Sequence, residues 1–359
     1  MALCVLPATG CVSPKTGAGS KATPTDLIAR GQYLVNGIAR CFLCHSPLDN
    51  GDPAVPRPET LGAGDVLDEK APLVAPNITF DRETGLGDWS DQEIIRAIRE
   101  GIGRDGRELQ EHPANHYSVM TDEDVSAVVA YLRSLRPIQR KLPRSAPPLR
   151  KGEWVQRKGV PALSSALNSP LQRGAYLVQL GECIGCHTPS HPDGSVFREL
   201  EFAGGRRFRL EKGYGVDIGT FDPTFSSAAV APPTTGQVVA SANITPDPSG
   251  IPYYTEAIFI QTIRMGKVKG VRPLSAAMPW VFFRTMSDPD LRDIFAYLKT
   301  LRPIQHRVDN TEEPTFCPRC GRRHGFGERN VPLQAERASV GCQPSARPAL
   351  DDKRTRFHP

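Results

Sequence analysis

The five residues Cys41-Phe42-Leu43-Cys44-His45 occur a second time, with the same spacing of cysteines and histidine, as Cys183-Ile184-Gly185-Cys186-His187. The segments around them repeat in the same order. Arg-Gly-x-Tyr-Leu-Val precedes each copy, and Asn-Ile-Thr and Tyr-Leu-x-x-Leu-Arg-Pro-Ile-Gln follow it. These segments lie at 30–35, 77–79 and 131–139 in the first half, and at 173–178, 243–245 and 297–305 in the second. The repeat predicts two tandem domains of one fold.

Each repeat should end in a helix, because apolar residues recur there every three or four positions. This stripe comprises Val125, Val128, Val129, Leu132 and Leu135 in the first half, and Leu291, Ile294, Phe295, Leu298 and Leu301 in the second. Thr121 and Ser287 stand where N-caps belong. Pro137 and Pro303 should end the two helices. The 34 prolines and 32 glycines indicate long loops and little sheet.

Two thiols spaced Cys-x-x-Cys can form thioethers with the two vinyl groups of one haem, and the adjoining histidine can then bind its iron. A single copy could also be a fragment of a zinc or redox site, but two copies at equivalent positions favour haem. The predicted attachment residues for two covalently bound haem c groups are Cys41, Cys44, Cys183 and Cys186, and the predicted axial ligands are His45 and His187.

The iron of an electron carrier normally has a sixth ligand from a distant loop. In the second half, Met278 lies eight residues before Met286, beside the predicted helix cap. The same count back from Met120 in the first half reaches His112. We therefore predict Met278 and His112 as sixth ligands, which makes the first haem bis-histidine. For that haem, His116, Met120 and an open iron remain alternatives.

The repeat divides the chain into five segments. Two domains are predicted at 26–140 and 169–306, joined by a proline-rich, basic linker at 141–168. Residues 1–25 are predicted to be a leader or tether, and residues 307–359 an irregular tail, because the tail lacks helical periodicity. The second domain contains an insertion between Thr188 and Asn243, including Gly-Gly-Arg-Arg-Phe at 204–208, which is expected to form a loop over the second haem.

The two ends carry further cysteines. Ala8-Thr9-Gly10-Cys11 resembles the cleavage box of bacterial lipoproteins, so a lipid tether at Cys11 and a plain apolar leader are rival hypotheses. Cys317-Pro318-Arg319-Cys320 is followed by glycine, so a third haem is not expected. With His324 and Cys342 nearby these cysteines could bind zinc, but a disulfide is favoured.

The net charge of +5 is small for this length and is not concentrated in one block. It gives nucleic-acid binding little support. The sequence contains no run of about 18 apolar residues, the length that a helix needs to span a bilayer.

These motifs resemble the tandem modules of the dihaem and trihaem cytochrome c subunits of bacterial membrane-bound alcohol dehydrogenases. The shared features include Arg-Gly-x-Tyr-Leu-Val, Gly-Gly-Arg-Arg-Phe, Asn-Ile-Thr and the Met-Pro-Trp of 278–280. The resemblance covers residues 26–306. It implies an all-helical class I cytochrome c fold for each half, with haem attached after export to the periplasm. A third module is not found here, and His112 replaces the usual methionine.

The predicted function is that of a dihaem c-type cytochrome, an extracytoplasmic carrier that relays electrons from a dehydrogenase or other redox donor protein to a downstream carrier or oxidase. Met/His ligation raises the reduction potential relative to bis-histidine ligation, so electrons should pass from the first haem to the second. The alternative is a dihaem cytochrome c peroxidase. A non-catalytic carrier is favoured, because both halves offer a sixth ligand.

Overall fold

The structure is a computed structural model of the 359-residue chain. It describes residues 23–48, 55–68, 73–109, 112–143, 167–191, 195–211, 214–217, 238–270, 272–275, 277–306, 308, 315–316 and 323–324. Most of the predicted leader, of the linker and of the tail lies outside these ranges. So do four cysteines for which predictions were made: Cys11, Cys317, Cys320 and Cys342.

The described residues are mostly helical, and the helices follow the same order in the two halves. The first half contains α1 (Pro24–Asn36), α2 (Cys41–Cys44), α3 (Asp91–Glu100), α4 (Ala114–Tyr117) and α5 (Asp122–Ser134). The second half contains α6 (Pro170–Leu180), α7 (Cys183–His187), α8 (Glu256–Met265), α9 (Trp280–Phe283) and α10 (Asp288–Leu298). Two short 3-10 helices, at Pro58–Thr60 and Arg198–Leu200, also occupy corresponding places. The helical character predicted from the sequence is confirmed.

The last helix of each half begins where predicted but ends earlier. The hydroxyls of Thr121 and Ser287 accept hydrogen bonds from backbone N–H groups in the first turns of α5 and α10. Leu135 and Leu301, expected within the helices, lie beyond the last helical residues. Beyond the helices, the carbonyls of Ile138 and Ile304 accept hydrogen bonds from Asn77 and Asn243 of the Asn-Ile-Thr motifs.

A glycine of the repeated Arg-Gly-x-Tyr motif lets the first and last helices of each half touch. A side chain at Gly31 in α1 would collide with the carbonyl of Ala127 in α5. At Gly174 in α6 it would collide with the carbonyl of Asp293 in α10. The motif therefore marks a backbone-to-backbone helix crossing in both halves.

The strands are short and antiparallel. They form a pair of β1 (Asp65–Asp68) and β2 (Leu73–Ala75), a sheet in the order β4 (Tyr214–Asp217), β3 (Arg207–Glu211), β5 (Val238–Ala240), and the pairs β6 (Lys267–Val268) with β7 (Arg272–Pro273) and β8 (Thr315–Phe316) with β9 (Arg323–His324). The prediction that 204–208 is a loop is wrong in part, because β3 starts at Arg207. The alternation of charged and apolar residues from Arg207 to Leu210 is typical of a strand.

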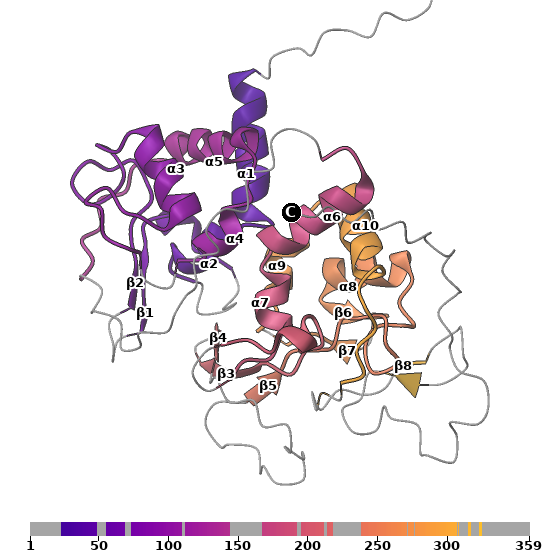
Figure 1. Cartoon of the computed structure of the whole chain (residues 1–359). Coiled ribbons are helices and arrows are strands. Elements are labelled where there is room, and N and C mark those ends of the chain that lie inside the picture. The colour runs from indigo at the N-terminus through magenta and orange to yellow at the C-terminus, as the bar shows by residue number, and fades with distance from the viewer. Residues whose placement is uncertain are drawn as a thin grey trace, which may run out of the picture.

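The two halves lie side by side (Figure 1). Buried apolar residues of both halves form a single cluster. Across the contact, the Tyr33 hydroxyl donates to Asp290 Oδ2 at 2.6 Å, and the Tyr176 hydroxyl donates to Asp124 Oδ2 at 2.6 Å. Tyr33 and Tyr176 are equivalent in the repeat, as are Asp124 and Asp290, so the contact is reciprocal. Such reciprocity is the property of a two-fold interface.

Candidate haem sites

Each Cys-x-x-Cys-His motif begins a short helix directly after a residue with left-handed backbone. Arg40, before α2, has a φ of 41°, and Glu182, before α7, has a φ of 57°. Residues that carry a Cβ rarely adopt this region. The four motif cysteines (Cys41, Cys44, Cys183 and Cys186) are free thiols. Free thiols at this spacing are what thioether attachment of haem requires.

The motif histidines are oriented in the same way in both halves. His45 Nδ1 lies 2.7 Å from the carbonyl oxygen of Pro76, and His187 Nδ1 lies 2.7 Å from that of Ala242. A carbonyl only accepts, so Nδ1 carries the proton and Nε2 keeps the lone pair that a metal needs. Burial lowers the pKa of both rings below the ordinary value, which favours the neutral form that binds iron.

The two orienting carbonyls directly precede the Asn-Ile-Thr repeats, which hold them in place. Asn77 donates from Nδ2 to the carbonyl of Ile138 at 2.7 Å, and Asn243 donates to the carbonyl of Ile304 at 2.9 Å. Each asparagine Oδ1 also accepts from the backbone N–H of the threonine two residues on, at 2.9 Å. The sequence marked these segments as repeated, but their role in positioning the motif histidines emerges only from the structure.

His112 and Met278 occupy the same backbone position in the two halves. Each is followed by a proline that caps a four-residue helix, α4 or α9. The φ and ψ angles are −77° and 40° at Pro113, and −78° and 46° at Pro279. The equivalence inferred by counting residues is therefore matched by local geometry.

The surroundings of His112 suit a ligand. Its Nδ1 is buried and has no hydrogen-bond partner within the described part of the chain. Burial, with a smaller effect of the nearby His45, lowers the pKa of His112 to about 4. The ring is therefore neutral at pH 7, and a buried polar atom without a partner is costly unless something binds there. Met278 is partly buried and packs against the shared core.

The other two sequence candidates for the first iron lie elsewhere. His116 lies beside the attachment helix of the second half. Its Nε2 is 3.6 Å from Oε1 of Glu182, the residue before α7, and faces Gly185 within that helix. Met120 is 1% exposed and belongs to the apolar core. His112, by contrast, lies close enough to His45, the first motif histidine, for that ring to contribute to its lowered pKa.

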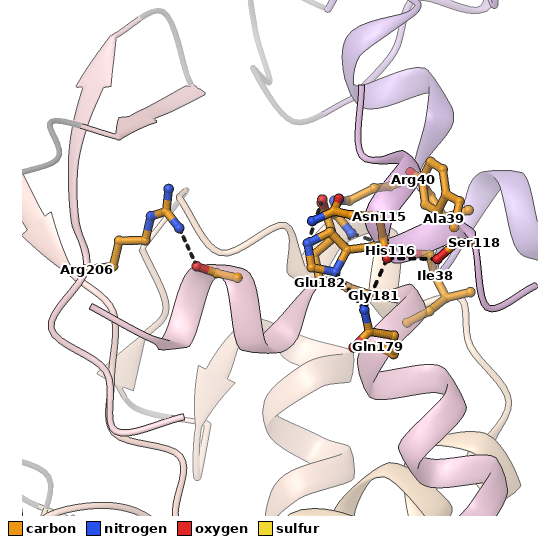
Figure 2. A network of polar contacts seen from close by, with 12 residues as sticks. Ile38, Ala39, Arg40, Asn115, His116, Ser118, Gln179, Gly181, Glu182 and Arg206 are labelled. Atoms are coloured by element: carbon orange, nitrogen blue, oxygen red, sulfur yellow. Dashed lines mark hydrogen bonds and ion pairs between the residues drawn. The ribbon is translucent and has the colours of Figure 1, made fainter. Parts of the chain in front are cut away.

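One contact to the second motif comes from the Gly-Gly-Arg-Arg-Phe segment. Arg206 Nη1 donates to the carbonyl of Gly185, inside α7, at 2.7 Å (Figure 2). The sequence analysis placed this segment in a loop over the second haem but predicted no role for Arg206. It ties the insertion of the second half to its attachment helix.

Residues 28–136 match the model of the cytochrome c family. This region begins in α1 and ends just after α5, so it contains Cys41, Cys44, His45 and His112. A cytochrome c domain implies covalently bound haem c, and the free thiols and oriented histidine of the first half fit that group.

Three relatives extend the comparison beyond the first half. The cytochrome c subunit of the alcohol dehydrogenase (quinone) of Gluconobacter oxydans is 25% identical over 77% of this chain and 55% of its own length. The cytochrome c subunit of the gluconate 2-dehydrogenase of Pantoea cypripedii is 32% identical over 45% of this chain and 38% of its own. A diheme cytochrome c-type protein of Cereibacter sphaeroides is 29% identical over 46% of this chain and 58% of its own.

The alignments thus span less than two thirds of the length of each of these relatives. The resemblance to cytochrome c subunits of bacterial alcohol dehydrogenases is confirmed.

Proposed function

We propose that this chain is a dihaem c-type cytochrome, two tandem haem domains that transfer electrons outside the cytoplasm. The observation that carries the proposal is the repeated geometry of the motif histidines. In both halves Nδ1 is bound to a backbone carbonyl at 2.7 Å, so Nε2 is available to iron. Haem bound there would supply one-electron chemistry. The similarity to a protein named diheme cytochrome c-type supports the count of two.

The proposed axial pairs are His45 with His112 in the first half, and His187 with Met278 in the second. The matching backbone at Pro113 and Pro279 supports this alignment. Methionine ligation gives the second haem the higher potential. Electrons would therefore enter at the first half and leave from the second.

The proposed partners are a redox donor protein, such as a dehydrogenase, and a downstream carrier or oxidase. The names of two of the relatives, which are dehydrogenase subunits, support this class of donor. We propose that the protein works on the periplasmic side, where haem is attached, and that Cys11 can carry a lipid tether. Within the described ranges, no helix is long and apolar enough to cross a membrane.

Haem counting tests the proposal. The protein, exported in a host with the haem-attachment machinery, should carry two haem c groups per chain by the pyridine haemochrome assay. Replacing Cys183 and Cys186 by alanine should leave one, and replacing Cys41 and Cys44 should leave the other. A single haem in the unaltered protein would contradict the proposal.

The peroxidase alternative has weaker support. It requires an iron without a sixth ligand, whereas both halves offer one at an equivalent position. None of the three relatives named above is a peroxidase. Steady-state oxidation of a reduced donor by hydrogen peroxide at enzymatic rates would restore this alternative, and its absence with two low-spin haems would exclude it.

A further inference from the structure

A partly buried ion pair lies between the two attachment motifs. Arg40, directly before Cys41, pairs with Glu182, directly before Cys183 (Figure 2). Arg40 is 8% exposed as a residue, and its Nη1 also donates to the carbonyl of Gly181 at 3.0 Å. The guanidinium thus crosses from the first half onto the turn that starts α7. The pair joins the N-terminal ends of the two attachment helices.

The surroundings of the pair exclude most water. Arg40 stacks over the ring of Phe283, with 5.6 Å from its guanidinium carbon to the ring centroid. On the other side, His116 Nε2 lies 3.6 Å from Glu182 Oε1. A charge enclosed in this way acts over a longer range than a surface charge, because fewer solvent dipoles and ions screen it.

The charge of Arg40 reaches both motifs. Burial raises the pKa of the Cys41 and Cys183 thiols to about 12, and the positive charge of Arg40 acts against that rise at both sites. Breaking a buried pair also leaves the remaining charge uncompensated, which is costlier than neutralising both partners.

Both members of the pair adopt left-handed backbone, at a conformational cost that glycine would avoid. The presence of arginine and glutamate here, in place of glycine, therefore indicates that their side chains have a role. We propose that Arg40 and Glu182 are positioning residues which dock the two haem motifs on each other and set the reduction potentials of both haems by their opposite charges. This inference rests on the proposed dihaem function.

The sign of the effect follows from electrostatics. Reduction adds a negative charge to a haem, so a nearby cation favours the reduced form and raises its potential, while a nearby anion lowers it. Arg40→Gln removes the cation and leaves the carboxylate, so both midpoint potentials should fall. Glu182→Gln leaves the cation, so both should rise. The double variant should return towards the unaltered protein.

The experiment is a redox titration of the holoprotein and these three variants, each first shown to carry two haems. Arg292 and Glu256 provide the matched control. They form an exposed ion pair within the second half, with 2.7 Å between Arg292 Nε and Glu256 Oε1. Replacing either by glutamine should leave both potentials unchanged. If Arg40→Gln does not fold, the comparison of Glu182→Gln with the double variant isolates the Arg40 charge, and the double variant should have the lower potentials.

Opposite shifts for the two single variants support the proposal. Shifts of the same sign would mean that the pair only shields the haems from water, and unchanged potentials would mean that it only holds the halves together. Either result overturns the assignment. Fewer than two haems in the unaltered protein would instead refute the dihaem function itself.

Discussion

At the level of single residues, the least expected feature is a histidine at position 112, where the second half has Met278. Its buried, unpartnered Nδ1 and its proximity to His45 mark it as the proposed sixth ligand. His112→Ala should convert one of the two haems to a high-spin form, because the replacement opens an iron position. Near-infrared magnetic circular dichroism would report the change.

The control for this experiment is His116→Ala, four residues away and turned towards the second half. Both haems should stay low-spin in that variant. If His116→Ala, and not His112→Ala, produced the high-spin signal, the ligand assignment of the first haem would be wrong.

Acid should destabilise the fold through its buried histidines. Burial lowers the pKa of His112 from the ordinary 6.5 to about 4, and it lowers the pKa of His45 and His187 as well. The unfolded chain therefore takes up protons first as the pH falls. The stability from neutral His112 is complete above pH 6.5 and is lost towards pH 4.

Ligation to iron would lower these pKa values further, so the sign is the same with haem attached. Urea unfolding at pH 7 and pH 5 should give a smaller free energy of unfolding at pH 5. The decrease should be smaller in His112→Leu, which has one titrating histidine fewer. An equal decrease in both proteins would show that the protonation of His112 does not contribute to the loss of stability.

At the level of elements, the crossings of α1 with α5 and α6 with α10 depend on glycine. Gly31→Ala should push α1 away from the carbonyl of Ala127 and cost about 1–3 kcal/mol, the usual cost of overpacking. Gly174→Ala should do the same in the second half. Gly106→Ala is a useful reference, because a Cβ there would meet nothing within 4 Å.

Chemical denaturation would measure these costs. Gly106 has a φ of 81°, so its alanine variant reports the backbone strain alone, without a collision. A smaller loss of stability in Gly31→Ala than in Gly106→Ala would show that the crossing can relax.

Many of the helices and their N-terminal ends were predictable from the sequence. The final helices and their caps at Thr121 and Ser287 were predictable because apolar periodicity and capping are local properties. The early ends of these helices were not, because the apolar periodicity continues to Leu135 and Leu301, beyond the last helical residues. The strand β3 was missed because the whole sheet lies inside the insertion of the second half, where the repeat offers no counterpart for comparison.

At the level of the whole molecule, the shared core and reciprocal bonds predict cooperative unfolding of the two halves. Tyr33→Phe and Tyr176→Phe each remove a hydrogen bond to a buried aspartate across the contact. Each should cost about 1.5–3 kcal/mol, the range for hydrogen bonds to charged groups. Calorimetry of the double variant should resolve two transitions where the unaltered protein shows one.

Tyr297→Phe is the reference substitution, because this half-buried tyrosine belongs to one half and takes no part in the reciprocal bonds. Two transitions already present in the unaltered protein would show that the halves unfold independently.

The contact between the halves could not be predicted from the sequence. The tyrosines belong to the repeated Arg-Gly-x-Tyr-Leu-Val segments, but nothing in the sequence indicated that their hydroxyls bond across the two halves. The attachment cysteines and motif histidines, by contrast, stand within five consecutive residues, so their chemistry could be predicted from spacing alone.

The ion pair between residues 40 and 182 has a consequence for ancestry. These two positions are equivalent in the repeat and meet each other at the centre of a reciprocal contact. In a homodimer of an undivided ancestor, the same residue would have faced its own copy there, arginine against arginine or glutamate against glutamate. Once the gene had doubled, the two positions could diverge to opposite charge. The pair is thus an asymmetry that two identical subunits could not have, and it requires the two halves to differ in sequence where they meet.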